Sequence, residues 1–264
     1  PAATEKMLAT FLDEHTSEMA RLSKRFGQEL KVSATCFNNV IHSFAKNNNS
    51  NKATEWFQKM RLVQCSPDIY SFSSLMHVHS REGEVEKCLD IFNQLVAEGI
   101  EPGTVSYSTL IAAFSKQGDI GSAEKYFNIM VDAKVEPNLQ LFTSMLHCCA
   151  QLGDFERAES WLQRMPEFKL DWSTQHFNCV LDAYSKASVL KPTSSHVFTS
   201  NEIVSSSTEK RKVATAAIRL MDQVENCSTC SPDALSFNVL LTILAKASGV
   251  TSTVATFRRI SEVG

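Results

Sequence analysis

Cysteine and histidine are the residue types in this chain best suited to bind a metal ion or to act as a nucleophile or base. The spacing of Cys227 and Cys230 fits one half of a zinc site, but no second pair supplies the other two ligands. The seven histidines are scattered, and His77 and His79 have no evident partner for a nucleophile or a metal. The sequence also lacks a deaminase signature, the clustered aspartates of a metal-dependent nuclease, a P-loop and a dinucleotide-binding fingerprint. We therefore expect no metal, no cofactor and no catalytic residue, and predict that the chain is not an enzyme.

Short polar side chains recur along the chain at a fixed spacing. Each follows directly after an aromatic residue, and the set is Asn38, Ser73, Ser108, Thr143, Asn178 and Asn238. Asn, Ser and Thr carry hydrogen-bond donors and acceptors that can meet the Watson–Crick edge of a nucleic acid base. The same positions would also be polar on a solvated helix face, and the sequence leaves both interpretations open.

A second recurring set is basic. It consists of Lys46, Arg81, Lys116, Gln151, Lys186 and Lys246, of which five are cationic. A row of cations spaced one structural unit apart is what binding to a phosphate backbone requires. The competing interpretation is that each cation compensates the dipole at the carboxyl end of a helix, an effect of roughly 0.3–1 kcal/mol. Both roles are compatible with the sequence.

Pairs of helices must position both sets. In residues 104–138 the first apolar stripe has the i, i+3, i+4, i+7 spacing of a helix face: Tyr107, Leu110, Ile111 and Phe114. Gly118 then acts as a stop signal, because helices commonly end in a left-handed residue that glycine adopts most easily. A second stripe follows at Ala123, Tyr126, Phe127 and Met130, and Pro137 closes the unit. This segment therefore predicts a helix, a turn, a second helix and a stop.

Copies of this unit recur with a period of 35 residues. The fourth residue is aromatic in all six copies: Phe37, Phe72, Tyr107, Phe142, Phe177 and Phe237. The twelfth residue is always Ala or Ser, which suits close approach of two helices. Since no single unit can bury its own apolar stripes, the units must stack on one another. The pattern favours an all-α fold, an α-solenoid of helix-turn-helix repeats, over an ordinary helical bundle.

The repeats divide the chain as 34–68, 69–103, 104–138, 139–173, 174–233 and an incomplete sixth at 234–264. Residues 1–33 are expected to form an N-terminal capping helix or a truncated repeat. The fifth repeat contains a Ser-rich insertion at about 187–212, whose composition is typical of disorder unless the array or a partner holds it. Because the chain begins at Pro1 and not at Met, we expect a processed or incomplete chain.

Composition restricts the class of protein. The net charge is only -3, from 26 basic and 29 acidic residues, which argues against non-specific nucleic acid binding but permits a local basic groove. Several of the eight cysteines occupy small or apolar positions, as Cys88 does, which indicates reduced, buried thiols in an intracellular compartment. No apolar run approaches the roughly 18 residues that span a bilayer, so no membrane span is predicted.

The period of 35 residues, the helix starts YSTLI, FNNVI, FNCVL and FNVLL, the Lys-x-Gly turn and the Pro-Asp end resemble pentatricopeptide repeats of the P type. The resemblance covers about residues 34–264. It implies a right-handed superhelix whose first helices line an inner groove. It also implies that each repeat reads one base of single-stranded RNA through its fifth and its last residue.

Transferred to this chain, the resemblance assigns five reading pairs: Asn38 with Asp68, Ser73 with Gly103, Ser108 with Asn138, Thr143 with Ser173, and Asn178 with Asp233. Asn238 would read with a partner beyond the sixth repeat. In the family Asn with Asp favours uracil, and Ser or Thr with Asn favours adenine. The implied order, 5′ to 3′, is U, an unassigned base, A, a second A and U. The second and fourth pairs depart from the usual combinations, so those two bases stay open.

Two main hypotheses of function follow. In the first, the chain is an organellar single-stranded RNA-binding protein, in a mitochondrion or plastid, that acts in RNA processing, stability or translation. In the second, it is a scaffold subunit of a large organellar ribonucleoprotein such as a ribosome, and binds protein subunits or structured RNA. The near-neutral charge and the polar second residues Gln140 and Gln175, where the family usually has an aliphatic residue, favour the scaffold. The Asn–Asp pairs and the basic set favour base reading. A third hypothesis is the RNA-recognition half of an enzyme with a catalytic domain beyond Gly264.

Overall fold

The computed structural model describes residues 33–187, 200–225 and 232–247. The predicted N-terminal cap, the Cys227–Cys230 pair and the second helix of the sixth repeat lie outside this part. The described residues form α-helices and one short 3-10 helix, without a strand among them, which confirms the all-α prediction. The chain divides into two compact units, Pro1–Gln117 and Gly118–Gly264.

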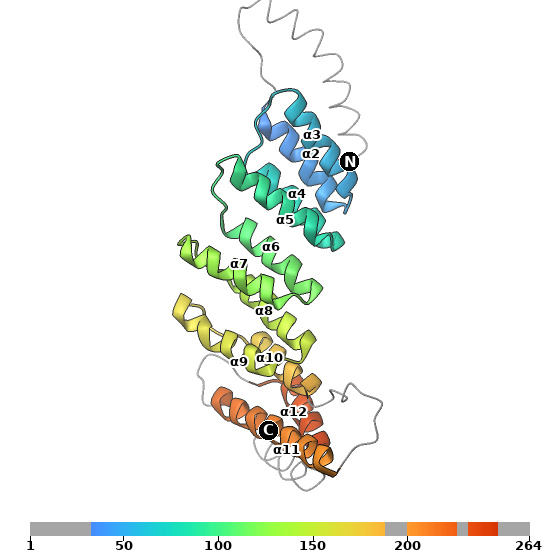
Figure 1. Cartoon of the computed structure of the whole chain (residues 1–264). Helices are drawn as coiled ribbons and strands as arrows, with labels where there is room; N and C mark the ends of the chain where they lie inside the picture. The colour runs from blue at the N-terminus through green and yellow to red at the C-terminus, as the bar shows by residue number, and fades with distance from the viewer. Residues whose placement is uncertain (1–32, 188–199, 226–231, 248–264) are drawn as a thin grey trace, which may run out of the picture. The chain divides into compact units, whose positions relative to one another are not determined.

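The first unit stacks its helices in pairs. Its described helices are α2 (Ala34–Lys46), α3 (Ser50–Leu62), α4 (Ile69–Glu82), α5 (Val85–Ala97) and α6 (Thr104–Gln117). The first helices of successive repeats, α2, α4 and α6, pack side by side. Helices α3 and α5 pack against them and fill the spaces between repeats (Figure 1).

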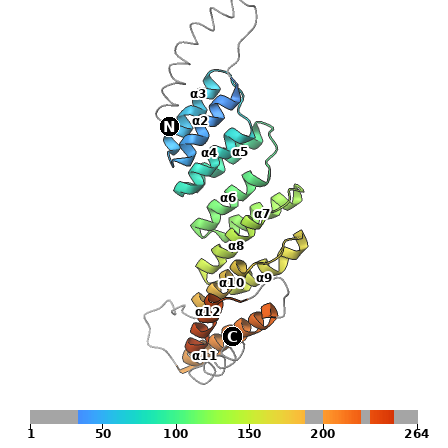
Figure 2. The same cartoon turned by 180° about the vertical axis from the view of Figure 1, so that it is seen from behind.

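The second unit continues the same pattern within itself. Its described helices are α7 (Ile120–Asp132), α8 (Leu139–Leu152), α9 (Phe155–Arg164) with the 3-10 turn η1 (Met165–Phe168), α10 (Thr174–Ala187), α11 (Ser200–Glu225) and α12 (Ala234–Ala247). Here the first helices α8, α10 and α12 form the row, with α8 against α10 and α10 against α12 (Figure 2). Each unit is thus a short α-solenoid.

The burial of the aromatic residues follows the predicted period. The aromatic side chains at the fourth position, from Phe37 to Phe177, are buried, and Phe237 is half-buried. Phe142 is fully buried and meets Phe127 and Trp161 edge-on, with ring centroids 5.6 and 6.0 Å away. Aromatic pairs in this arrangement gain more than their buried area alone would give. The fourth residue therefore joins neighbouring helices into a continuous core.

The helix ends follow from local chemistry. Gly83, Gly118 and Gly153 adopt positive φ angles of 80°, 82° and 70° directly after first helices, the conformation that ends a helix at little cost in glycine. In the first repeat Asn48 takes the left-handed conformation instead, with φ 53°. At the other end, Asp68 accepts hydrogen bonds from backbone N–H groups of α4 and forms a capping box with Ser71. The left-handed residues thus set where the first helices end, and Asp68 sets where α4 begins.

The Ser-rich insertion departs in part from its predicted disorder. Helix α11 begins at Ser200 and runs without interruption to Glu225, so residues 200–212 are helical. The expected second helix of the fifth repeat, Ala214 to Met221, is therefore the buried end of a longer helix. The physical reason is that a helix nucleated by packing extends at low cost through residues such as Glu, Lys and Arg. Residues 188–199 lie outside the described part.

The predicted thiols behave as small apolar side chains in the core. Cys88, Cys148 and Cys149 are buried, and Cys36 is exposed. Burial raises the pKa of Cys88 to about 12, and burial is also the main cause that raises the pKa of Cys148 to about 11. In the described part of the chain, no helix is long and apolar enough to cross a membrane.

Candidate nucleic-acid interface

The predicted base readers lie on the first helices. Asn38 and Ser73 lie in the first unit, on the neighbouring helices α2 and α4, and Thr143 and Asn178 in the second, on the neighbouring helices α8 and α10. All four are half-buried. Within each unit, stacking of the first helices thus places short polar side chains of successive repeats next to one another.

The first reading pair forms a closed hydrogen-bonded cluster. The Nδ2 atom of Asn38 donates to both carboxylate oxygens of Asp68, at 3.0 and 2.9 Å. The Oδ1 atom of Asn38 accepts from the hydroxyl of Ser71 at 2.5 Å. Ser71 is the third residue of the next repeat, and its backbone N–H also donates to Asp68. The amide of Asn38 is therefore held at its nitrogen by one residue and at its oxygen by another.

The fifth repeat builds the same cluster across the insertion. The Nδ2 atom of Asn178 lies 3.2 Å from Oδ2 of Asp233, although the two residues are 55 positions apart. The hydroxyl of Ser236 donates to Oδ1 of Asn178 at 2.6 Å. Asp233 also accepts from the backbone N–H of Ser236 at 2.8 Å. The insertion therefore keeps the same set of contacts as in the uninterrupted first repeat, with longer distances from Asn to Asp.

Both carboxylates of these pairs remain ionised acceptors. Burial raises the pKa of Asp68, but hydrogen bonds from Ser71, Asn38 and the Tyr70 backbone together outweigh it and hold the pKa below its usual value. Hydrogen bonds from Ser236, and then from Asn178, lower the pKa of Asp233 in the same way. Since an ionised carboxylate only accepts hydrogen bonds, each Asp can hold the amide of its Asn in one orientation only.

The fourth repeat replaces the direct contact by a histidine bridge. His176, buried in α10, lies between Thr143 and Ser173, with Nε2 2.9 Å from the Thr143 hydroxyl and Nδ1 2.8 Å from the Ser173 hydroxyl. The backbone N–H of Ser173 donates to Nδ1, so the ring proton is on Nε2. Burial lowers the pKa of His176 and so favours the neutral ring, and a hydrogen bond with the Leu139 carbonyl acts in the opposite direction. The hydroxyl proton of Thr143 is donated to the Leu139 carbonyl at 3.0 Å.

The other predicted readers have different surroundings within their own units. Ser73 has no side-chain partner at Gly103, and its hydroxyl lies 3.5 Å from Ser106. The hydroxyl of Ser108 is buried without a hydrogen-bond partner among the described residues. Asn138 caps α8 by accepting from the backbone N–H of Leu141 at 2.9 Å. Asn238 is exposed on α12.

Apolar side chains next to the readers are open to solvent. The second residue of a repeat is exposed throughout, and Tyr70, Val105 and Leu235 expose 72, 62 and 57% of their surface. An exposed aromatic or aliphatic side chain offers a flat surface on which a base can stack. Gln140 and Gln175 are exposed at the same positions of the fourth and fifth repeats, and they present a poorer surface.

The predicted basic set is exposed, but it differs between the units. Lys46, Arg81 and Lys116 have no acidic side chain within ion-pair distance in the described part of the first unit. In the second unit Lys186 pairs with Asp182 at 2.8 Å, and Gln151 takes the place of a cation.

His77 reports the electrostatic environment of the first unit. Burial lowers its pKa, and the nearby charges of Arg81, Lys116 and His42 lower it further. The charges of Arg81 on α4 and Lys116 on α6 therefore both act on His77.

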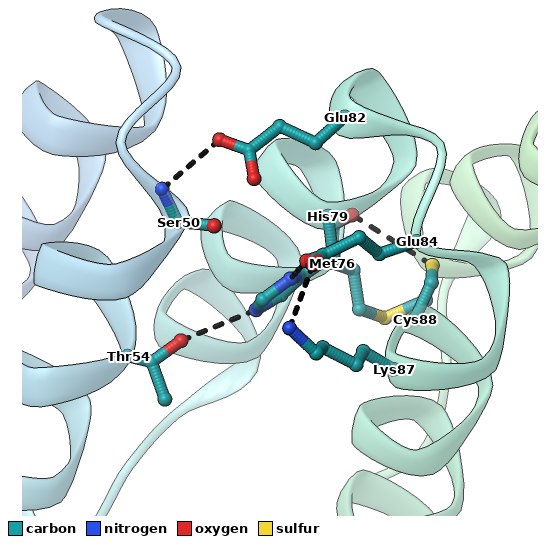
Figure 3. A network of polar contacts seen from close by, with 8 residues as sticks. All are labelled: Ser50, Thr54, Met76, His79, Glu82, Glu84, Lys87 and Cys88. Atoms are coloured by element: carbon teal, nitrogen blue, oxygen red, sulfur yellow. Dashed lines mark hydrogen bonds and ion pairs between the residues drawn. The ribbon is translucent and has the colours of Figure 1, made fainter.

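A second polar cluster joins the first two repeats, and the sequence analysis missed it. His79, for which the sequence indicated no partner for a nucleophile or a metal, has two hydrogen-bond partners: Nε2 lies 3.2 Å from the Thr54 hydroxyl and Nδ1 2.6 Å from the Glu84 carboxylate (Figure 3). Lys87 donates to the same carboxylate at 2.7 Å. The period could not indicate this contact. Glu84 lies at the N-terminus of α5, but its side chain does not cap that helix and binds His79 and Lys87 instead.

This cluster has a structural equivalent, which identifies its role. Thr54 and His79 are the twenty-first and eleventh residues of successive repeats, and Glu159 and Tyr184 hold the same two positions in the second unit. The Tyr184 hydroxyl donates to Glu159. Because the same contact recurs with different chemistry, it serves as a polar link between repeats. No group of three metal-ligating side chains gathers in the described ranges.

Solved structures with this fold include RNA-bound proteins. The pentatricopeptide repeat protein PPR10, in complex with an 18-nucleotide psaJ RNA element, matches with a TM-score of 0.56 and 19% identity. The match covers all of this chain and 39% of that one, so this chain spans about two fifths of its length. The PPR domain of Arabidopsis thaliana protein-only RNase P 1, in complex with tRNA, matches over 68% of this chain and 98% of its own, with a TM-score of 0.52 and 20% identity.

A third structure, nuclear proteinaceous RNase P 2 from A. thaliana, matches with a TM-score of 0.62 and 14% identity over 82% of this chain and 43% of its own. At such identities these matches show the fold. A search of curated protein sequences finds no significant match.

Family profiles match the sequence directly. The profile of the PPR repeat family matches residues 32–80, 67–115 and 102–151, and the profile of the PPR repeat matches residues 141–170. Together they cover more than half of the chain. Their starting points follow the repeat register that the buried aromatic residues define. The chain therefore belongs to the pentatricopeptide repeat family.

Proposed function

We propose that this chain binds single-stranded RNA and reads bases along the row of its first helices. The observation that carries the proposal is the pair of matching clusters around Asn38 and Asn178. In each cluster the amide nitrogen of the Asn donates one N–H to an ionised Asp, and the amide oxygen accepts from a Ser hydroxyl. The second N–H and the second oxygen lone pair remain available to a ligand. These leftover groups are the complement of a base edge that offers an acceptor next to a donor, as uracil does.

Two further features support RNA as the partner. The exposed side chains of Tyr70 and Val105 flank the readers of the first unit and provide stacking surfaces. The exposed cations Lys46, Arg81 and Lys116 supply charge for the phosphates. In this proposal the chain acts as a binding protein, not a catalyst, in the processing, stability or translation of a transcript in a mitochondrion or plastid. The resemblance to organellar members of the family suggests the location.

A scaffold role in a large ribonucleoprotein is the second candidate, and the second unit favours it. There Lys186 forms an ion pair with Asp182, and Gln151 stands where other repeats have a cation. Gln140 and Gln175 stand where other repeats have an apolar residue suited to stacking. A face of this kind suits contact with protein subunits better than contact with a bare phosphate backbone.

The first test recodes the first repeat. The double variant Asn38→Ser with Asp68→Asn should shift the preference at the first base from U to A. The mismatched base should cost on the order of 1–3 kcal/mol. Asn is as good an N-cap as Asp, so α4 should keep its start. Equilibrium binding of single strands containing UAAAU or AAAAU, in identical flanks at fixed salt, measures the preference.

The fifth base provides the internal control, because neither substitution touches Asn178 or Asp233. The double variant should keep the wild-type preference for U over A at that position. If neither protein binds any of these strands above background, base reading is ruled out and the scaffold role is favoured.

A further inference from the structure

In four repeats of the described part, the third residue contacts the proposed base reader of the preceding repeat. The hydroxyl of Ser71 meets Asn38 at 2.5 Å and that of Ser236 meets Asn178 at 2.6 Å. His176 meets Thr143 at 2.9 Å, and Ser106 lies 3.5 Å from Ser73. The contact recurs in both units with different side chains. All four third residues are buried and all four readers half-buried, so the third residue acts from behind the reader.

The order of donor and acceptor on an amide decides which base it fits. Uracil offers the acceptor O4 next to the donor N3–H, whereas adenine offers the donor N6–H next to the acceptor N1. An amide that turns by 180° about its last torsion exchanges its oxygen and nitrogen and so fits the other base. A reading Asn distinguishes these bases only if its orientation is fixed.

Two contacts fix the orientation of Asn38. Asp68 accepts from the nitrogen, and Ser71 donates to the oxygen. Asp68 is occupied at the same time as the N-cap of α4, where it accepts from the backbone N–H groups of Tyr70 and Ser71. The carboxylate is therefore shared among several donors. The hydroxyl of Ser71 accepts from the backbone N–H of Asp68 at 3.2 Å and has one proton, for which Oδ1 of Asn38 at 2.5 Å is a nearer acceptor than Oδ1 of Asp68 at 3.0 Å. Ser71 is thus the partner that holds the amide oxygen.

We propose that Ser71 and Ser236 are specificity-determining residues: each fixes the amide of the preceding repeat's Asn in the orientation that selects uracil over adenine. The proposal rests on the base-reading function proposed above, and it adds a third position to the pair that reads each base. In the fourth repeat the same position is His176. There the His176 ring lies 2.9 Å from the Thr143 hydroxyl, which donates to the Leu139 carbonyl at 3.0 Å, so Thr143 too is held from the third position of the next repeat.

The test uses the two serines as controls for each other. Ser71→Ala should lower the ratio of affinities for U over A at the first base by about three- to tenfold, the effect of losing one hydrogen bond made in a single orientation. It should leave the ratio at the fifth base unchanged. Ser236→Ala should do the reverse. The strands are UAAAU, AAAAU and UAAAA in identical flanks, measured with the full chain at fixed salt.

A ratio of two affinities measured on one preparation does not depend on the fraction that is folded, so a partly destabilised variant still gives an answer. Equal loss of affinity for all three strands, with both ratios kept, would mean that the serines only support the helix caps and would overturn the inference. Full discrimination by both variants would overturn it as well, while base reading would stand. A wild-type protein that binds the three strands equally would instead remove the proposed function itself.

Discussion

At the scale of single residues, the last residue of a repeat serves two purposes. Asp68 caps α4 and anchors Asn38, and Asp233 does the same for α12 and Asn178. A carboxylate can serve both because its two oxygens accept several hydrogen bonds while it stays ionised. The stability of the helix start and the orientation of the Asn amide therefore depend on the same carboxylate. Substitutions of this Asp should affect both.

The basic residues allow a prediction that separates their two possible roles. If Lys46 and Lys116 contact phosphates, Lys46→Ala and Lys116→Ala should each weaken binding to all single strands alike. Each should also reduce the slope of log affinity against log salt by about 0.7, the counterion release per contact for single strands. Lys186→Ala is the matched control: Lys186 is already paired with Asp182, so its removal should change the slope less. Weaker binding at an unchanged slope would assign the cations to the helix dipoles instead.

At the scale of helices, aromatic side chains at the fourth position hold the array together. Phe142 on α8 contacts Phe127 on α7 and Trp161 on α9, so one ring joins three helices. Polar contacts such as those of His79 with Thr54 and Glu84 also fix the relative orientation of the helices, because hydrogen bonds are directional and apolar contacts are not (Figure 3). The readers depend on this packing because each cluster is built from two successive first helices.

Phe142→Ala should therefore lower the free energy of unfolding by roughly 3–5 kcal/mol, the usual effect of truncating a fully buried aromatic residue. Chemical denaturation followed by circular dichroism measures the change. Leu152→Ala, at a side chain of the same helix that is 44% exposed, is the control and should have a small effect. Equal effects of the two substitutions would show that the assigned register is incorrect.

At the scale of the whole molecule, the boundary between the compact units does not coincide with a repeat boundary. It follows Gln117, inside the third repeat, between α6 and α7. Each unit has its own row of first helices and its own buried aromatic residues. In repeat proteins stability is carried by contacts between nearest neighbours, so distant segments can open independently.

Hydrogen exchange should reveal this independence. In Phe142→Ala the amides of α8, α9 and α10 should exchange faster, whereas those of α2 and α4 should keep their wild-type protection. The reverse pattern is expected for Phe72→Ala, since Phe72 is buried in the first unit and contacts Phe57 there. Uniform acceleration along the chain in either variant would show that the array unfolds as a single cooperative unit.

The sequence by itself determined the class of fold, the repeat period, the buried aromatic residues and the positions of the short polar residues that follow them. These properties depend on the alternation of apolar and polar residues, which is local and can be read directly. The pairing of Asn178 with Asp233 across the insertion followed from the repeat register together with the family resemblance. The helical state of residues 200–212 did not, because it depends on nucleation by the packed end of α11.

Only the tertiary structure decided which side chains meet around each reader. Ser71 and His176 lie at the same position of their repeats, yet one holds an amide and the other separates Thr143 from Ser173. Hydrogen bonds of this kind require donor and acceptor to lie within about 3 Å and in line, after both have lost water. A period in the sequence shows that two residues will be neighbours, but the packing distance and orientation of two helices decide whether and how they bond.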